Sequence, residues 1–406
     1  MEKIVITGMG AITPVGNTVA DYWDGLMNGT AGIGRITRFD PTEYPVQIAG
    51  EVKGFDPTVY MPRKLAGEMD LFMQYAYAAA EQALTDSQLP IEPGRTGIVM
   101  GTALDGMTEI ARTQQELTAA GKKVGPRFLP KVLGNIAAAQ VAMAHQITGP
   151  SMTVNTACSS GADAIILAAM LLKTGEADSI LVLSAESPIN PLVIYSLSKA
   201  MALSRNNDAP ETASRPFDLS RNGFVMGEGG GALVLETESH AKARGAKVYA
   251  ELAGYGNTSD AHHVTAPDPT GVGAARCMEN AIAMAGIDKS EIGYINAHGT
   301  ATHAGDVAET TAIKLVFGDA AHTPPVSSTK GATGHLMGAG GITETIACIL
   351  AIQNGMLPPT RNLTEVDPAC DLDYVPQVPR AAQIKAAMSN AFGFGGQNTT
   401  ILVKAY

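Results

Sequence analysis

Residues 3–10, Lys-Ile-Val-Ile-Thr-Gly-Met-Gly, form a strand-like apolar run that ends in a glycine turn. Residues 247–256, Lys-Val-Tyr-Ala-Glu-Leu-Ala-Gly-Tyr-Gly, open in the same way. A repeated opening in a chain of 406 residues indicates an internal duplication. We therefore predict an α/β fold built from two similar halves, residues 1–246 and 247–406.

After these openings the two halves carry the same series of elements. An alanine-rich helical pattern comes first, then a short apolar run ending at a glycine or histidine turn, then a helix that begins with small residues. These segments are 72–84, 96–101 and 159–173 in the first half, and 272–285, 292–298 and 338–353 in the second. Two segments without a counterpart, 121–150 and 188–215, are expected to carry partner contacts and substrate covers.

Charge and hydropathy exclude several classes of function. The chain has 28 Lys and Arg against 39 Asp and Glu, a formal net charge of −11, and no basic block, which argues against nucleic-acid binding. Its apolar runs are shorter than the ~20 residues that cross a bilayer. The first residues lack the pattern of a signal peptide. We expect a cytoplasmic protein without a membrane partner.

One cysteine stands where a nucleophile would be expected. Residues 154–163, Val-Asn-Thr-Ala-Cys-Ser-Ser-Gly-Ala-Asp, place Cys158 between an apolar strand and a helix of small residues. At the amino end of a helix, the dipole and free N–H groups favour a thiolate. Cys277, Cys348 and Cys370 fit buried structural positions better. No CxxC pair is present, so neither a disulfide framework nor a zinc ribbon is expected.

Polar partners for Cys158 come from the second half. His298 immediately follows a short apolar run, and Lys330 and His335 lie five residues apart around a glycine turn. Strand ends of this kind form the active-site edge of α/β sheets. A cysteine with two histidines can also bind zinc, but without a paired cysteine we predict no metal site.

Four ordered motifs resemble those of the elongating type II β-ketoacyl-[acyl carrier protein] synthases, and the likeness runs nearly end to end. They are Thr-Ala-Cys-Ser-Ser-Gly at 156–161, Asn-Ala-His-Gly-Thr-Ala-Thr at 296–302, Ser-Ser-Thr-Lys-Gly-Ala-Thr-Gly-His at 327–335 and Ser-Asn-Ala-Phe-Gly-Phe-Gly-Gly-Gln-Asn at 389–398. The resemblance implies the thiolase fold, five αβαβα layers from two duplicated halves. It also implies a homodimer whose central strands pair across a two-fold axis, and the apolar or small residues 154–156 suggest a strand buried from all directions.

The resemblance implies a decarboxylative Claisen condensation that elongates fatty acids. Cys158 would take the acyl chain as a thioester, and malonyl-carrier protein would lose CO2 to give the attacking enolate. His298 and His335 would donate hydrogen bonds from Nε to the enolate oxygen. Lys330 would add fixed positive charge with Glu344 as its partner, and the backbone N–H groups of Cys158 and Phe394 would form the oxyanion hole.

The same resemblance implies how substrate is held. No bound cofactor is expected, because the substrates arrive on the phosphopantetheine of an acidic, transiently bound acyl carrier protein. Hydroxyls of Thr300, Thr302 and Thr265 would bind the pantetheine. The loop carrying Gly393 and Gly395 would let Phe394 act as a gate. Leu104 would limit chain length, and Phe128 would reach the partner subunit's tunnel.

Two departures from the family pattern fall where carrier protein is expected to dock. The stretch before Met69 lacks its usual arginines, and Met201 stands where an arginine is common. Fewer basic groups should slow association with an acidic carrier. The remaining basic candidates for carrier docking are Arg63, Lys64, Lys122, Lys123, Arg127 and Lys199.

Alternatives remain at this stage. Thiolases carry a second catalytic cysteine that the 389–398 stretch lacks, and the initiating synthases use Cys-His-Asn rather than Cys-His-His. A non-catalytic chain-length subunit would lack Cys158. A ketosynthase of a specialised polyketide or polyene pathway remains open beside fatty-acid elongation, since the docking positions differ.

Overall fold

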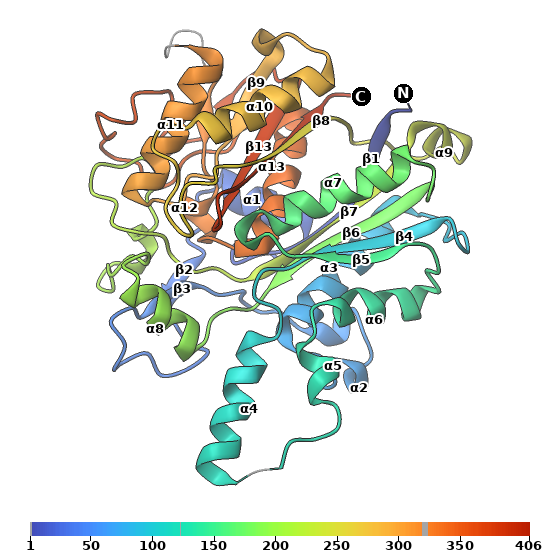
Figure 1. Cartoon of the computed structure of the whole chain (residues 1–406), viewed down its shortest axis with the longest axis vertical. Coiled ribbons are helices and arrows are strands. Elements are labelled where there is room, and N and C mark those ends of the chain that lie inside the picture. The colour runs from blue at the N-terminus through green and yellow to red at the C-terminus, as the bar shows by residue number, and fades with distance from the viewer. Residues whose placement is uncertain (1, 122, 319–323) are drawn as a thin grey trace.

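The computed structural model describes residues 2–121, 123–318 and 324–406 (Figure 1). Across these residues the main sheet runs in the order β10-β9-β13-β14-β8-β1-β7-β6-β4-β5. Its strands are β1 Ile4–Ile12, β4 Thr96–Gly101, β5 Ser151–Val154, β6 Ser179–Glu186, β7 Gly229–Thr237, β8 Ala250–Ser259, β9 Ile292–Asn296, β10 Val326–Ser327, β13 Ala386–Gly393 and β14 Gln397–Lys404. Short pairs are formed by β2 Ile33–Arg35 with β3 Ile48–Gly50 and by β11 Met356–Leu357 with β12 Arg380–Ala381.

Helices connect these strands. The α-helices are α1 Val19–Met27, α2 Arg63–Ala66, α3 Leu71–Ser87, α4 Met107–Ala120, α5 Phe128–Val132, α6 Asn135–His145, α7 Ser160–Lys173, α8 Pro191–Lys199, α9 Glu238–Ala243, α10 Val272–Ala285, α11 His303–Phe317, α12 Lys330–Thr333 and α13 Gly340–Asn354. The 3-10 turns are η1 Pro57–Val59, η2 Ala157–Ser159, η3 Pro210–Thr212, η4 Lys289–Glu291 and η5 Met337–Ala339. In the described part of the chain, no helix combines the length and apolar character that a bilayer crossing demands.

Strand order repeats between the two halves, which confirms the predicted duplication. In the first half, β1 and β6 pair antiparallel with β7, while β4 pairs parallel with β6 and β5. In the second half, β8 and β13 pair antiparallel with β14, while β9 pairs parallel with β13 and β10. The halves join through a short antiparallel contact, Ile4 to Ile6 against Leu252 to Ala250. The predicted division at 246/247 falls between α9 and β8 and stays a prediction.

The helices complete the five predicted αβαβα layers. Helix α3 packs on β1, β6 and β7, and α10 packs on β8 and β14, so each covers an outer face. Helices α7 and α13 pack on each other and lie between the two half-sheets. Their small residues allow this approach: a Cβ on Gly161 would lie 2.5 Å from the Gly338 carbonyl oxygen, and one on Gly341 would lie 2.4 Å from the Ala162 nitrogen.

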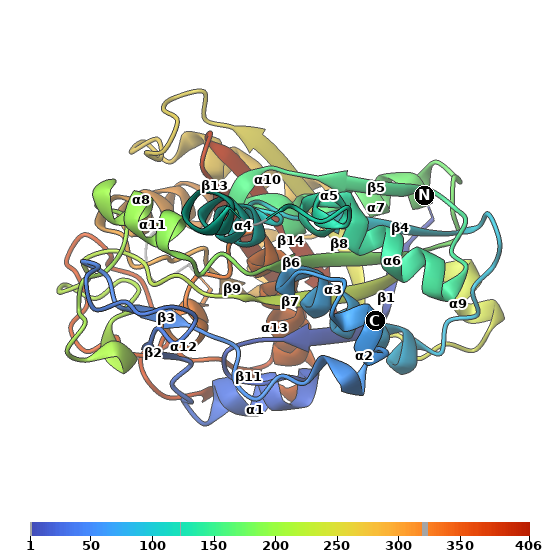
Figure 2. The same cartoon turned by 90° about the horizontal axis from the view of Figure 1, so that it is seen from below.

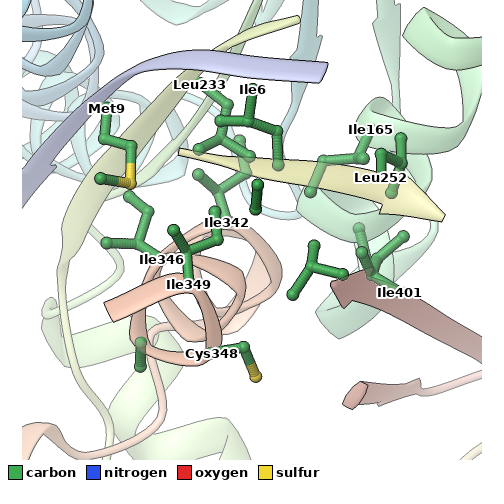
Figure 3. Packing of buried hydrophobic residues seen from close by; sticks show 14 of the residues in the cluster. Ile6, Met9, Ile165, Leu233, Leu252, Ile342, Ile346, Cys348, Ile349 and Ile401 are labelled. Atoms are coloured by element: carbon green, nitrogen blue, oxygen red, sulfur yellow. The ribbon is translucent and has the colours of Figure 1, made fainter. Parts of the chain in front are cut away.

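Isoleucines of α13 fill the space between the half-sheets. Figure 3 shows Ile342, Ile346 and Ile349 facing Met9 and Leu233 of the first half, with Ile401 of β14 close by. All of these side chains are almost fully buried. This packing fixes the two active-site edges relative to each other, because any shift of α13 would open voids against both sheets.

Two parts of the first half are not covered by other elements of the described chain: helices α4 and α5, and strand β5. Helices α4 and α5 extend from the body, with α4 projecting downward in Figure 1 and viewed nearly end-on in Figure 2. Strand β5 lies at the edge of the sheet, and its residues Ser151 to Thr153 are exposed. Among the described residues β5 pairs with β4 on one side alone, so burial of this strand from all directions would need the second copy of the predicted homodimer, and that expectation stays a prediction.

Candidate active site

Cys158 lies at the strand-to-helix turn that the sequence predicted. It follows β5 in the turn η2, and α7 begins two residues later. The preceding residue, Ala157, has a φ of 53°, a left-handed conformation that is costly for a residue with a Cβ. Cys158 is 5% exposed and lines a cavity of about 340 Å³, here named the Cys158 cavity. The turn therefore presents a single thiol to an internal space.

Burial dominates the electrostatics of this thiol. It raises the pKa of Cys158 to about 11, while the backbone N–H of Phe394, the Lys330 ammonium and the N–H of Cys158 itself act in the opposite direction. The N–H groups act on the pKa in the direction that the sequence predicted, but desolvation outweighs them and leaves the pKa of Cys158 raised. The two N–H groups predicted to form an oxyanion hole do lie near the sulfur.

A glycine brings the Phe394 loop against the nucleophile turn. A Cβ on Gly393 would lie 2.6 Å from the Thr156 carbonyl oxygen and 3.2 Å from the Cys158 nitrogen. Any side chain there would displace the turn that carries Cys158. Beyond it, Gly395 has a φ of 87°, which lets the chain reverse between β13 and β14.

The two predicted histidines meet in the cavity. His298 follows β9, and His335 follows α12. Their rings lie edge to face with centroids 5.2 Å apart, and both line the Cys158 cavity. Burial lowers the pKa of both rings well below the usual value, and the Lys330 charge lowers it further. Both imidazoles are thus neutral at pH 7 and can donate or accept a hydrogen bond.

Lys330 and Glu344 form a buried ion pair, as predicted. The Lys330 ammonium donates a short hydrogen bond to Glu344 Oε1, and both side chains are almost fully buried. Burial raises the pKa of Glu344 to about 7, against the opposing effect of Lys330. The Lys330 charge also lowers the pKa values of Cys158, His298 and His335, so it acts on all three groups of the cavity.

Sequence reasoning missed Glu309. Its carboxylate accepts backbone N–H bonds from His298 at 2.9 Å and from Gly299 at 2.8 Å, and a side-chain bond from Asn390 at 3.1 Å. It therefore fixes the backbone of the histidine loop. The available signal was the pair Asp306 and Glu309, two acidic residues three positions apart on the helical segment that follows the His298 motif.

The predicted pantetheine hydroxyls lie along the Cys158 cavity. Thr300 and Thr302 are within 3.1 Å of each other through their hydroxyl oxygens, and both line the cavity with Thr265. Two apolar rings that the sequence did not single out also contact the histidines. Phe224 packs on His335 and Phe392 on His298, with centroids 5.4 and 5.8 Å apart.

Leu104 and Phe128 lie away from this cavity's lining. Leu104 packs against the apolar cluster that contains Cys158, but it is not among the residues lining the cavity. Helices α4 and α5 and the described residues between them, 107–121 and 123–132, are here named the projecting segment. Phe128 lies in this segment, in a surface groove with Lys123 and Arg127. Their proposed roles in chain length and in a partner's tunnel stay predictions.

The predicted docking cations fall into separate surface positions. Arg63 and Lys64 lie on α2, Lys199 ends α8 beside the Cys158 cavity, and Lys123 lies in the groove of the projecting segment. Lys122 lies outside the described residues. Arg127 makes a short ion pair with Glu68.

Comparison with known proteins identifies the chain. The family model for the N-terminal domain of β-ketoacyl synthases matches residues 1–241, and that for the C-terminal domain matches residues 249–364. The chain belongs to the β-ketoacyl synthase family. It is 45% identical over 409 residues to 3-oxoacyl-[acyl-carrier-protein] synthase 2 of Synechocystis, covering 100% of this chain and 98% of that protein. The protein of the same name from Coxiella burnetii is 43% identical, with 99% of each chain covered.

Solved ketosynthases share the fold of this β-ketoacyl synthase. The ishigamide ketosynthase/chain length factor matches with a TM-score of 0.93 and 34% identity, covering 100% of this chain and 99% of that one. A β-ketoacyl synthase from Burkholderia phymatum matches with a TM-score of 0.92 and 35% identity, with both chains fully covered. A type II polyketide ketosynthase in complex with its acyl-carrier protein matches at 0.91 and 32%, also over both whole chains. The predicted thiolase fold is thereby confirmed.

Proposed function

We propose that this synthase joins an enzyme-bound acyl thioester to malonyl-[acyl carrier protein], giving 3-oxoacyl-[acyl carrier protein] and CO2. The observation that carries the proposal is the meeting of Cys158, His298 and His335 in one buried cavity, beside the Lys330–Glu344 pair. The thiol comes from one half of the fold and both histidines from the other, so the site exists only when both halves are docked.

In the first step, Cys158 Sγ attacks the thioester carbonyl of the acyl carrier. The bond from that carbon to the pantetheine sulfur breaks, a bond to Cys158 Sγ forms, and the thiol proton leaves on the carrier's sulfur. The N–H groups of Cys158 and Phe394, which lie near Sγ, receive the carbonyl oxygen as it gains charge. Removing one such donor typically costs ~10²–10³ in rate.

In the second step, malonyl carrier occupies the vacated space. Its carboxylate leaves as CO2, and the electron pair of the broken C–C bond forms the enolate of the remaining thioester. Neutral His298 and His335 stabilise the enolate oxygen through N–H donors. The enolate carbon then attacks the Cys158 thioester and the new C–C bond forms. Cys158 Sγ leaves as a thiolate and takes up a proton from solvent.

The Cys158 cavity suits a substrate delivered on a long arm. Its lining runs from Cys158 past Thr300 and Thr302 to Thr265, which is exposed. Hydroxyls along a mostly apolar channel can bond the amides of phosphopantetheine while the acyl end reaches the thiol. The reaction as written needs no further cofactor or metal.

The synthase acts in fatty-acid elongation, as the names of its curated relatives indicate. A polyketide role has support only from the names of structural neighbours at lower identity.

The experiment is to offer acyl carriers from short to long chains and to detect Cys158 adducts by intact mass, followed by condensation with malonyl carrier. We expect saturated chains to load across the range. Strict preference for unsaturated, aromatic or branched acyl groups would contradict the fatty-acid role.

The synthase is also proposed to work as a homodimer. Strand β5 leaves one edge unpaired among the described residues, and Met152 on it is 44% exposed although it is apolar. Pairing this edge with the β5 of a second copy would bury Met152 and satisfy the free backbone groups next to the Cys158 turn. Light scattering of the active enzyme tests this, and a stable, active monomer would contradict it.

A further inference from the structure

The carboxylate of Asp163 joins the turn η2 to the second half of the fold. Asp163 lies in the first turn of α7 and is 8% exposed. Its Oδ2 accepts a hydrogen bond from the Thr156 hydroxyl at 2.5 Å and lies 3.1 Å from the Ser159 hydroxyl oxygen. Its Oδ1 accepts hydrogen bonds from the Asn257 amide and the Thr399 hydroxyl, both at 2.8 Å. One carboxylate oxygen thus contacts the first half of the fold, and the other contacts the second.

The contacts to Oδ2 lie on both sides of a strained residue. Thr156 and Ser159 flank Ala157, whose φ of 53° is costly for a residue with a Cβ. A conformation of this kind persists where the surrounding contacts hold it in place. Cys158 lies between the two contacts, so the carboxylate that holds both ends of the turn also fixes the direction of the Cys158 thiol and backbone N–H.

The contacts to Oδ1 reach the strand that follows the Phe394 loop. Asn257 of β8 and Thr399 of β14 are direct partners in the antiparallel register, so their side chains share one face of the sheet. Strand β14 begins at Gln397, three residues after Phe394. The Asp163 carboxylate is therefore linked to both N–H groups of the proposed oxyanion hole, through η2 on one side and through β14 on the other.

We propose that Asp163 is a positioning residue for acyl transfer, which holds the N–H groups of Cys158 and Phe394 at the separation that receives the substrate carbonyl oxygen. This inference rests on the proposed function. Three hydroxyls and an amide surround the carboxylate, so each of its oxygens lies within hydrogen-bond distance of two donor groups. An amide side chain cannot serve all four, because its nitrogen accepts no hydrogen bond.

A role confined to helix stability makes a different prediction. An acidic side chain in the first turn also stabilises a helix through its dipole. If Asp163 only stabilised α7, its loss would lower the folded fraction and change every reaction of the Cys158 thiol by the same factor. If Asp163 positions the oxyanion hole, its loss slows only the reaction in which an oxyanion forms.

The test compares two reactions of the same thiol in Asp163→Asn. Loading from acyl carrier protein, followed by intact mass in a single turnover, forms an oxyanion at the thioester carbonyl. Alkylation by iodoacetamide displaces iodide and forms none. Loading at saturating carrier should fall about 10- to 100-fold, because a small misplacement of the reacting groups costs this much. The alkylation rate should stay within about threefold of wild type, and the carrier concentration for half-maximal loading should not change.

Thr156 offers a matched pair of variants. Thr156→Val keeps the shape of the side chain but removes the hydroxyl that contacts Oδ2, so it should slow loading and spare alkylation, as Asp163→Asn does. Thr156→Ser keeps that hydroxyl and should load within about threefold of wild type. Rescue by serine would show that the hydrogen bond to the carboxylate, rather than the bulk of the side chain, supports loading.

Glu51→Gln is the control for the loss of a buried carboxylate. Glu51 is also 8% exposed, and it accepts hydrogen bonds from the Thr37 hydroxyl and from the backbone N–H groups of Thr37 and Arg38. It is not among the residues that line the Cys158 cavity. Glu51→Gln should lower the urea midpoint and leave the ratio of the loading rate to the alkylation rate unchanged.

The outcomes separate this inference from the proposed function. A fall in loading alone in Asp163→Asn, with rescue by serine at position 156, supports the positioning role. Unchanged loading, an equal fall in loading and alkylation, or the same change of ratio in Glu51→Gln overturns that role. Failure of the wild-type enzyme to load acyl carrier or to condense it with malonyl carrier overturns the proposed function instead.

Discussion

Replacing Cys158 by glutamine is expected to abolish condensation while the decarboxylation of malonyl carrier stays measurable. Acyl transfer needs the thiol, so condensation should fall about 10⁴-fold or more. Loss of CO2 from malonyl carrier uses the two histidines and the Lys330 charge, which the substitution leaves in place. Mass spectrometry of the 3-oxoacyl product and release of labelled CO2 measure the two activities separately.

Cys277→Ser is the matched control for this substitution. Cys277 is also fully buried, and its Sγ donates to the Asn398 carbonyl at 3.3 Å, a contact that a serine hydroxyl can keep. Both activities should survive in that variant. If folded Cys158→Gln lost decarboxylation as well, the division of labour between the thiol and the histidines would be wrong.

Replacing Lys330 by methionine is expected to lower the free energy of unfolding by about 3–5 kcal/mol, because it leaves Glu344 buried without its partner. The double variant Lys330→Met/Glu344→Leu should recover most of that loss, since neither buried charge remains. Urea denaturation measures the free energy of unfolding of the single and the double variant. Equal stability of the single and double variants would contradict this account of the pair.

The deficit of Lys330→Met should depend on pH. Burial raises the pKa of Glu344 to about 7, so the folded protein holds this proton at pH values where the unfolded chain has released it. Stability from this group is therefore present at low pH and is lost as pH rises through the folded pKa. In Lys330→Met the opposing Lys330 charge is gone, so the pKa of Glu344 should rise further. Both proteins then lose stability in parallel up to about pH 7, and the variant alone continues to lose it above that pH. The deficit should therefore be smallest near pH 5 and should grow above about pH 7.

An exposed pair provides the control for that prediction. Lys242 contacts Glu238 at 3.0 Å on the surface of α9, and the Lys242 side chain is largely exposed. Lys242→Met should shift the urea midpoint far less than Lys330→Met, because water and salt already screen this pair. A comparable loss in Lys242→Met and Lys330→Met would show that burial is not the cause.

Local sequence was sufficient for the elements and for most of the site. Helix α10 and strand β4 have the bounds that their patterns predicted, since an alanine-rich amphipathic segment and a short apolar run each fix one conformation. Cys158 and His298 were found because each lies within four residues of the end of a strand. The Lys330–Glu344 pair came from the family resemblance, and the structure brings the two together.

The hydrophobic pattern and the motifs of the sequence could not predict contacts between segments that are distant along the chain. Glu309 supports the His298 loop because α11, which follows that loop, places the Glu309 carboxylate against the N–H groups of His298 and Gly299. Glu68 meets Arg127 across 59 residues of sequence, which changes the charge offered by the projecting segment. The exposed state of β5 follows from its place at the sheet edge, and no feature of residues 151–156 reveals that place.

The sequence alone determined the duplicated α/β architecture and the identities of Cys158, His298, Lys330 and His335, because these depend on neighbours within a few residues. The tertiary structure decided how those groups behave. Burial raises the pKa of the Cys158 thiol, although the N–H groups at the helix end act in the opposite direction, and it lowers the pKa values of both histidines. Desolvation depends on every segment that packs around a group, and that surrounding exists only once the two halves have docked.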